Sequence, residues 1–212
     1  MFEGPSFRHA NLTSVTLKRA FLQSADLQNA TLRQTDLTAA ILRNANLDGA
    51  DLTQAKLNAA DLTGATLQGA ILVGASLVSA NLSEVNLQGI DFSGANLEGA
   101  YLDDAVLRGA TLKGADLYWA HLFGADLEGA NLQGAKLNGA DLKGANLRGA
   151  NLRQTNCSLD NVGGFTDLRG ANLSDAQLEG ANLRGARYSR TTIFLEGFDA
   201  NQHGMVFVED EA

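Results

Sequence analysis

The chain has 212 residues and a formal net charge of −8, with 23 glycines, one proline and one cysteine. The negative balance argues against direct binding to nucleic acid or to an anionic membrane surface. Met1 to Pro5 includes neither a basic nor an apolar stretch, so no signal peptide is predicted. No apolar run reaches the ~20 residues that span a bilayer. We therefore expect a cytoplasmic protein without direct nucleic-acid or membrane partners.

A five-residue repeat, Ala-Asn/Asp-Leu-x-Gly, dominates the sequence between Asp91 and Leu152. A helix turns about 100° per residue, so leucines five apart would scatter around its surface. In an extended chain, Ala and Leu share one face, Asn or Asp points the other way, and Gly lets the chain turn. The repeat therefore predicts a parallel β-helix in which each copy is a short strand and a corner, with Leu and Ala inward. Clear copies are Ala95–Gly99, Ala125–Gly129, Ala130–Gly134 and Ala145–Gly149.

The outward aspartates favour four repeats per coil over three. With three repeats, Asp36 would stack on Asp51 at ~4.8 Å, and like charges directly opposite destabilise a sheet. With four repeats, Asp36 instead neighbours Lys56, and Asp116 neighbours Lys136.

This A-[D/N]-L-x-x pattern, sustained from about Phe7 to Tyr188, resembles the pentapeptide repeat family. The resemblance implies the right hand and the four-sided section of the coil. We therefore expect an all-β fold, a right-handed quadrilateral parallel β-helix of about nine to ten coils, capped at both ends.

Residues 1–188 are expected to form a single repeat domain, and residues 189–212 a C-terminal capping segment and tail. Phe2 and Phe7 take the central position of the first repeats, and with Pro5 they predict an N-terminal cap. The segment after Tyr188 resembles the closing segment of many cyanobacterial pentapeptide repeat proteins. Its apolar residues are predicted to cover the last coil: Ile193, Phe194, Phe198, Met205, Val206 and Phe207.

The repeat register slips by one residue near 160–166. Asp160 to Gly164 reads as a further repeat with Val162 at its centre, and Phe165 then adds one residue before the pattern resumes at Leu168. We interpret the extra residue as a tolerated bulge, with a binding feature as the alternative. Just before the slip, Cys157 takes a central position, which predicts a buried structural thiol without a redox or catalytic role.

Several outward aromatic side chains are predicted to gather on one face of the middle coils. With residues 20 apart in one column, Tyr101, His121 and Asp141 stack, and Trp119 lies at the neighbouring corner. Aromatic residues with a polar group are enriched at protein interfaces. The candidate protein-contact patch comprises Tyr101, Tyr118, Trp119, His121 and Phe123. The alternative is that Trp119 only covers the backbone of the glycines around it in its column, Gly99 and Gly139.

No catalytic, cofactor or metal site is predicted. The column of Tyr101, His121 and Asp141 superficially resembles a catalytic relay, but a flat, solvated face lacks the water-excluding pocket that catalysis requires. The sequence contains no metal-ligand spacing, phosphate-binding loop or nucleotide fingerprint. We therefore expect a protein that is not an enzyme.

The leading hypothesis is a rigid scaffold for protein–protein interaction, a monomer or weak end-to-end dimer, whose partner the sequence does not identify. The family resemblance adds an alternative, because some members mimic DNA and bind type II topoisomerases such as gyrase. Charge weighs against it: a rod of about 45 Å corresponds to duplex DNA with about 26 negative charges, whereas this chain has a net −8. A purely structural spacer is the third possibility.

Overall fold

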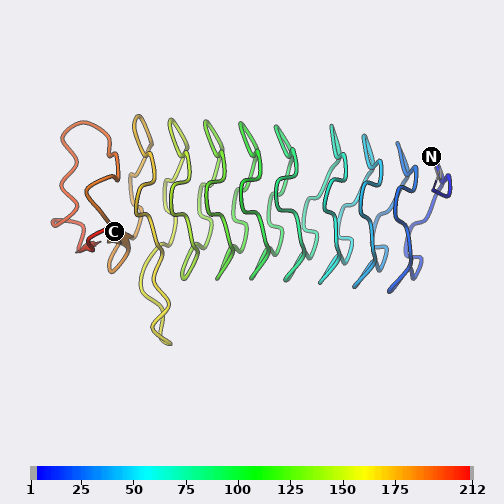
Figure 1. The fold of residues 1–212 in the computed structure, drawn as a ribbon, viewed down its shortest axis with the longest axis horizontal. Helices are drawn as coiled ribbons and strands as arrows, with labels where there is room; N and C mark the ends of the chain where they lie inside the picture. The colour runs from blue at the N-terminus through cyan, green and yellow to red at the C-terminus, as the bar shows by residue number, and fades with distance from the viewer. Residues whose placement is uncertain (1–3, 211–212) are drawn as a thin grey trace.

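The computed structural model describes residues 4–210 and shows a rod of stacked coils with the two termini at opposite ends (Figure 1). Parallel bridges join residues 20 apart, from Ser6 with Asp26 to Lys136 with Asn156, so each coil consists of four five-residue repeats. This pairing confirms the predicted four-sided section. The expected neighbours also meet: Lys136 Nζ lies 2.9 Å from the Asp116 carboxylate.

Of the two phenylalanines in the predicted N-terminal cap, Phe7 is partly buried against the core and Phe2 lies outside the described residues.

A typical repeat places two apolar side chains inside, and Asn or Asp at the outward position commonly closes a local hydrogen bond. Ala95 and Leu97, for example, are fully or almost fully buried. Between them, the Asn96 side-chain oxygen accepts the backbone N–H of Glu98 at 3.0 Å. Only short side chains such as Asn and Asp reach the backbone two residues further on, which explains why these two residues recur at this outward position.

The last residue of each repeat turns the corner in the left-handed backbone conformation. Between Gly64 and Gly149 this residue is mostly glycine, as at Gly99 (φ 59°). Between His9 and Ala59 the left-handed residues include a single glycine, Gly49. This conformation costs a residue with a Cβ atom about 1–2 kcal/mol. The N-terminal coils therefore carry more backbone strain than the middle coils.

The stack of coils is opened at one place, between the strands at Thr66 and Asn86. Neighbouring coils elsewhere pair at this face, as Asn46 does with Thr66 and Asn86 with Val106, but no bridge joins Thr66 to Asn86. Figure 1 shows the wider spacing between the cyan and green coils at this level. Within residues 4–210, no backbone hydrogen bond is formed by five N–H groups that would cross this gap: Gly64, Leu67, Gly69, Asn86 and Asp91.

The side chains of Val85 and Ile90 explain the opening. Both occupy the inward position that alanine takes in the coils before and after, at Ala65 and Ala70 on the open side. Coils stack at ~4.8 Å, so the added methyl groups in two successive inward positions press the neighbouring coil away. A single β-branched residue is tolerated: Thr35 is fully buried in the same kind of position, and the N–H of Lys56 still bonds to its carbonyl at 2.9 Å.

Residues 160–164 do not form the further repeat that the sequence predicted, because six residues leave the coil here. The offset between paired residues rises from 20 at Lys136 with Asn156 to 26 at Asp141 with Asp167. Val162, predicted as the centre of a repeat, is 77% exposed. Residues 160–165 form a loop, here called the insertion, which projects from the rod (yellow in Figure 1). Six residues equal one repeat plus one, and the sequence pattern alone therefore resembled a repeat with one extra residue.

The C-terminal segment folds back onto the final coil. Strand β1 (Arg187–Tyr188) pairs in parallel with strand β2 (Val206–Phe207). Met205 is buried, and Phe194 and Phe198 pack against the core with their rings 4.8 Å apart. Of the six apolar residues predicted to cover the last coil, three are about half exposed: Ile193, Val206 and Phe207.

Replacing Val85 and Ile90 together by alanine should close the open stack. Loss of the buried methyl groups destabilises the fold, whereas the regained hydrogen bonds stabilise it. Because the two contributions oppose each other, the free energy of unfolding should change by less than ~2 kcal/mol. Hydrogen exchange, followed residue by residue by NMR, should become at least ~10-fold slower at Leu67, Gly69 and Asn86. Val106→Ala, which shortens an outward side chain on the same face, is the matched control and should leave these rates unchanged. Equal rates in wild type and the double variant would contradict the steric explanation.

The Cys157 thiol should be unreactive in the folded protein. Its side chain is buried, as predicted, and burial raises the pKa of the thiol to about 12. The reactive thiolate is therefore almost absent at pH 8. Labelling with a disulfide reagent should proceed at least ~100-fold more slowly in buffer than in denaturant, and rapid labelling of the folded chain would disprove the assignment.

Candidate protein-contact site

The insertion is fastened to the coils by the carboxylate of Asp160. Its Oδ2 accepts hydrogen bonds from the Tyr118 hydroxyl at 2.7 Å and from Trp119 Nε1 at 3.2 Å. Its Oδ1 accepts the backbone N–H groups of Val162 at 2.9 Å and Gly164 at 2.6 Å. We call this arrangement the Asp160 clasp. It joins the insertion to side chains of the coils that precede it by about forty residues.

The clasp is formed best by an ionised Asp160. The Tyr118 hydrogen bond, together with the bonds from Gly164, Val162 and Trp119, lowers the pKa of the Asp160 carboxyl. The same hydrogen bond raises the pKa of the Tyr118 hydroxyl, because the ionised phenol would lose its donor and face a carboxylate. Both shifts favour the pair of a neutral tyrosine and a charged aspartate.

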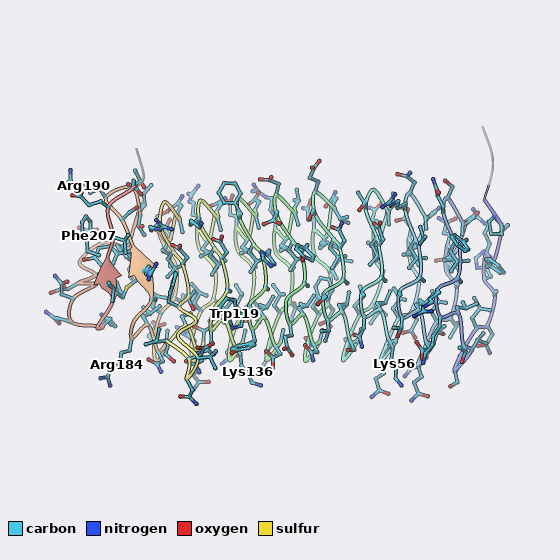
Figure 2. All side chains as sticks on the ribbon, turned by 60° about the horizontal axis from the view of Figure 1, so that its bottom comes forward. Lys56, Trp119, Lys136, Arg184, Arg190 and Phe207 are labelled. Atoms are coloured by element: carbon cyan, nitrogen blue, oxygen red, sulfur yellow. The ribbon has the colours of Figure 1, made fainter. Side chains whose placement is uncertain are left out.

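Trp119 covers Gly139, one of the two glycines that the alternative expected, and it also lies against Gly164 of the insertion. The other glycine, Gly99, meets Ser79 and not Trp119. A Cβ atom on Gly139 would come within 2.9 Å of the indole, and one on Gly164 within 2.5 Å. Figure 2 shows Trp119 beside the insertion. The side chain still remains 46% exposed. Part of the indole is therefore structural and part is available to a partner.

The other predicted patch residues lie on the same side of the rod. The rings of Tyr101 and His121 stack in parallel, with centroids 4.7 Å apart and an interplanar angle of 9°. Tyr101 and Phe123 are 44% and 52% exposed. Tyr118 is only partly exposed, because its ring packs edge-on against Trp119 and its hydroxyl is held by Asp160. The structure thus brings the five predicted residues to one region, in which Tyr118 acts as a support.

A shallow hollow of about 270 Å³ lies between Trp119 and the insertion. The coils contribute Trp119 and His121 to its lining, and the insertion contributes Phe165. The guanidinium of Arg187 covers one face of the Phe165 ring at 3.2 Å from the centroid, which fixes that ring. The residues that line the hollow are Trp119, Ala120, His121, Gly139, Ala140, Asp141, Lys143, Phe165, Asp167 and Arg169.

Two aspartates stack at the base of this hollow because the insertion changes the pairing. Asp141 and Asp167 are bridge partners, a like-charge contact that the sequence reading did not expect. Each carboxylate has its own cation: Lys143 lies 3.3 Å from Asp141, and Arg169 lies 2.8 Å from Asp167. The two ion pairs balance the charge, so the hollow presents aromatic surface over a neutral ionic base.

The groups that line the hollow determine the chemistry that it can offer. The hollow is open, and its histidine is stacked on a tyrosine ring with no nucleophile beside it. In the described part of the chain, no group of three or more His, Cys, Asp or Glu side chains is placed to hold a metal ion. No helix among the described residues has the length and hydrophobicity to cross a bilayer.

Three residues of this site are not predicted from the sequence, Asp160, Asp167 and Arg169, and Phe165 is considered there only as the alternative of a binding feature at the bulge. The sequence feature that could have indicated the insertion is the pair of consecutive glycines, Gly163 and Gly164, where the repeat is interrupted. Gly164 is buried beneath Trp119 and a side chain there would collide with the indole, so its glycine is required by a contact 45 residues away in the sequence.

Comparison with known proteins places the chain in a family. The family described as Pentapeptide repeats matches in eight copies, over residues 6–44, 20–58, 60–99, 90–129, 125–156 and 165–187. The matches omit residues 157–164, where the insertion leaves the coil. The chain belongs to the pentapeptide repeat family, whose members are right-handed quadrilateral β-helices.

Two solved structures illustrate the likeness. HetL, from the cyanobacterium Nostoc sp. strain PCC 7120 and described as involved in the regulation of heterocyst differentiation, is 32% identical, with 91% of this chain and 88% of HetL covered at a TM-score of 0.67. A trypsin-treated QnrB1, described as a plasmid-mediated fluoroquinolone resistance protein, is 16% identical, with 94% and 95% covered at a TM-score of 0.74. The second likeness concerns the fold alone. No curated protein matches the chain by sequence.

Removing the Asp160 carboxylate should release the insertion without unfolding the rod. In Asp160→Ala, four hydrogen bonds are lost, two from the loop backbone and two from Tyr118 and Trp119. Emission from the only tryptophan should therefore shift to longer wavelength, and proteolysis within 160–165 should accelerate at least ~10-fold. The free energy of unfolding should fall by no more than ~1 kcal/mol, because the loop lies outside the core. Asn161→Ala, in the same loop, is the control and should behave as wild type.

The clasp should also respond to pH. A lowered pKa means that its stabilisation is complete above the ordinary aspartate value of 3.8 and is lost as pH falls through the lower folded value. The wild-type tryptophan shift should therefore occur below pH 3.8 and be absent from Asp160→Ala. A wild-type transition above that pH, or the same transition in the variant, would show that another group holds the loop.

Proposed function

We propose that this protein is a non-enzymatic, rigid scaffold that binds a partner protein through the aromatic side chains around the hollow. The supporting observation is the combination of Tyr101, Trp119 and Phe123, each about half exposed, with a hollow of about 270 Å³ between Trp119 and the insertion. Aromatic residues that flank a depression are the usual anchors of protein interfaces.

The rigidity of the support favours binding without a large entropic cost. Each anchor extends from a coil that is fixed by backbone hydrogen bonds to both neighbouring coils. At this level the N–H of His121 donates to the carbonyl of Ala100 in one neighbour, and the N–H of Leu122 donates to the carbonyl of Asp141 in the other. The insertion is held by the Asp160 clasp, so Phe165 is positioned before a partner arrives. Pre-positioned side chains lose little conformational freedom on binding, which strengthens association.

The topoisomerase alternative receives no specific support from these surfaces. QnrB1 shares the fold at 16% identity, which does not transfer its role in drug resistance to this chain. The acidic side chains are also interleaved with bases, as in the pairs Arg8 with Asp26, Arg33 with Asp51 and Arg108 with Asp126, all within 3.3 Å. A continuous negative surface of the kind that would replace DNA is therefore not formed along these coils.

Affinity capture from a lysate of the source organism tests the proposed scaffold. The variant Tyr101→Ala/Phe123→Ala removes two anchors and keeps Trp119, so the insertion stays in place. A matched control is Phe21→Ala, which removes an 82% exposed aromatic from the same column as Tyr101, near the N-terminal end. A partner retained by wild type and the control, and reduced at least ~10-fold with the double variant, is expected.

The captured protein should then be purified and its affinity measured against the same three forms. A loss of affinity restricted to the double variant would support the aromatic face as the contact surface. Identical capture by all three forms would contradict it. Recovery of topoisomerase subunits that bind all three forms would support the alternative function.

A further inference from the structure

The open stack between Thr66 and Asn86 forms a second cleft, on a different face from the aromatic residues. Its volume is about 610 Å³. Its lining comprises Ala65, Thr66, Leu67 and Gln68 of one coil, Asn86, Gln88 and Gly89 of the next, and Asp48. The cleft therefore lies between the short extended segments at Thr66 and Asn86 and the turns that follow them.

Unpaired main-chain groups face each other across this cleft. In the regular stack, the N–H groups of Leu67 and Gly69 would bond to the carbonyls of Asn86 and Gln88, and the N–H of Asn86 to the carbonyl of Ala65, following the pattern of the flanking coils. None of these bonds is formed in the described chain. Backbone N–H and C=O groups that do not reach each other across the cleft need other hydrogen-bond partners. A partner that satisfies several of them must carry its own donors and acceptors at the spacing of a β-strand.

The side chains that line the cleft indicate the chemical class of such a partner. Thr66, Gln68, Asn86 and Gln88 are uncharged hydrogen-bonding residues, and the lining contains no aromatic ring on which a sugar or a base would stack. Extended peptides supply alternating N–H and C=O groups at strand spacing and bind other proteins by adding to exposed strands.

The charge of the cleft lining and of the whole chain indicates which kind of peptide is favoured. Asp48 is the one ionisable side chain of the lining; its carboxylate accepts the N–H of Gln68 at 2.8 Å, and the whole chain carries a net −8. A basic segment is favoured over an acidic one at this site.

We propose that this cleft binds an extended, basic segment of a partner protein through main-chain hydrogen bonds. Val85 and Ile90 hold the two strands apart, and the coils on either side keep them aligned. This site is independent of the aromatic face: the two surfaces have different residues and different recognition chemistry.

The test uses the full chain and a defined probe, an acetylated and amidated octapeptide of alternating threonine and lysine. Hydrogen exchange at Leu67, Gly69 and Asn86 should be fast without the peptide and at least ~10-fold slower at saturation. A peptide of the same sequence, N-methylated at every second amide, should give no slowing because it lacks the donors on one edge. An octapeptide of alternating threonine and glutamate should bind at least ~10-fold more weakly.

The second part of the test uses a variant in which the cleft should be closed. In Val85→Ala/Ile90→Ala, exchange at these amides should already be slow and independent of the peptide, whereas Val106→Ala should respond as wild type. The proposal is overturned if no peptide slows exchange, if the N-methylated peptide acts as well as its parent, or if the acidic peptide binds equally well. Each result is independent of whether a partner binds at Tyr101 and Phe123.

Discussion

The constraint on which this structure depends is the close spacing of successive coils. Every inward side chain lies directly above and below another at ~4.8 Å, so a column of residues must have sizes that fit this distance. Alanine and leucine satisfy it through most of the rod, and the main-chain hydrogen bonds follow. Val85 and Ile90 exceed it at two successive inward positions of one coil, and there the bonds are missing. Packing thus decides hydrogen bonding, because strands in a coil cannot slide to relieve a contact.

Much of the fold can be predicted from the sequence because the conformation of each repeat is determined by interactions within its own five residues. The inward positions of Ala95 and Leu97, the local bond of Asn96 and the turn at Gly99 depend only on five adjacent residues. The number of sides was also accessible, since it determines whether Asp116 neighbours Lys136. The opening beside Val85 and Ile90 was not predicted, because each is an acceptable inward residue by itself and the effect arises from the two together.

The candidate site was predicted only in its regular part. Tyr101 and His121 are 20 residues apart in uninterrupted repeats, so their stacking follows from the period. Phe165 and Asp160 lie in the insertion, whose length is one repeat plus one residue and which therefore resembles a repeat in sequence. The decisive contact, between Asp160 and Tyr118, joins an irregular loop to a regular coil, and no local rule determines such a contact.

The left-handed corners have a consequence for how the rod assembles. In a linear repeat protein, stability is approximately the sum of each unit and its contacts with its neighbours. The strained, non-glycine corners occupy the segment from His9 to Ala59, whereas glycines dominate from Gly64 onward. The missing bonds between Thr66 and Asn86 weaken the contact close to this boundary. The contact between neighbouring coils is therefore reduced close to the boundary between an N-terminal block with strained corners and a glycine-rich block, and we expect the rod to separate there first on unfolding.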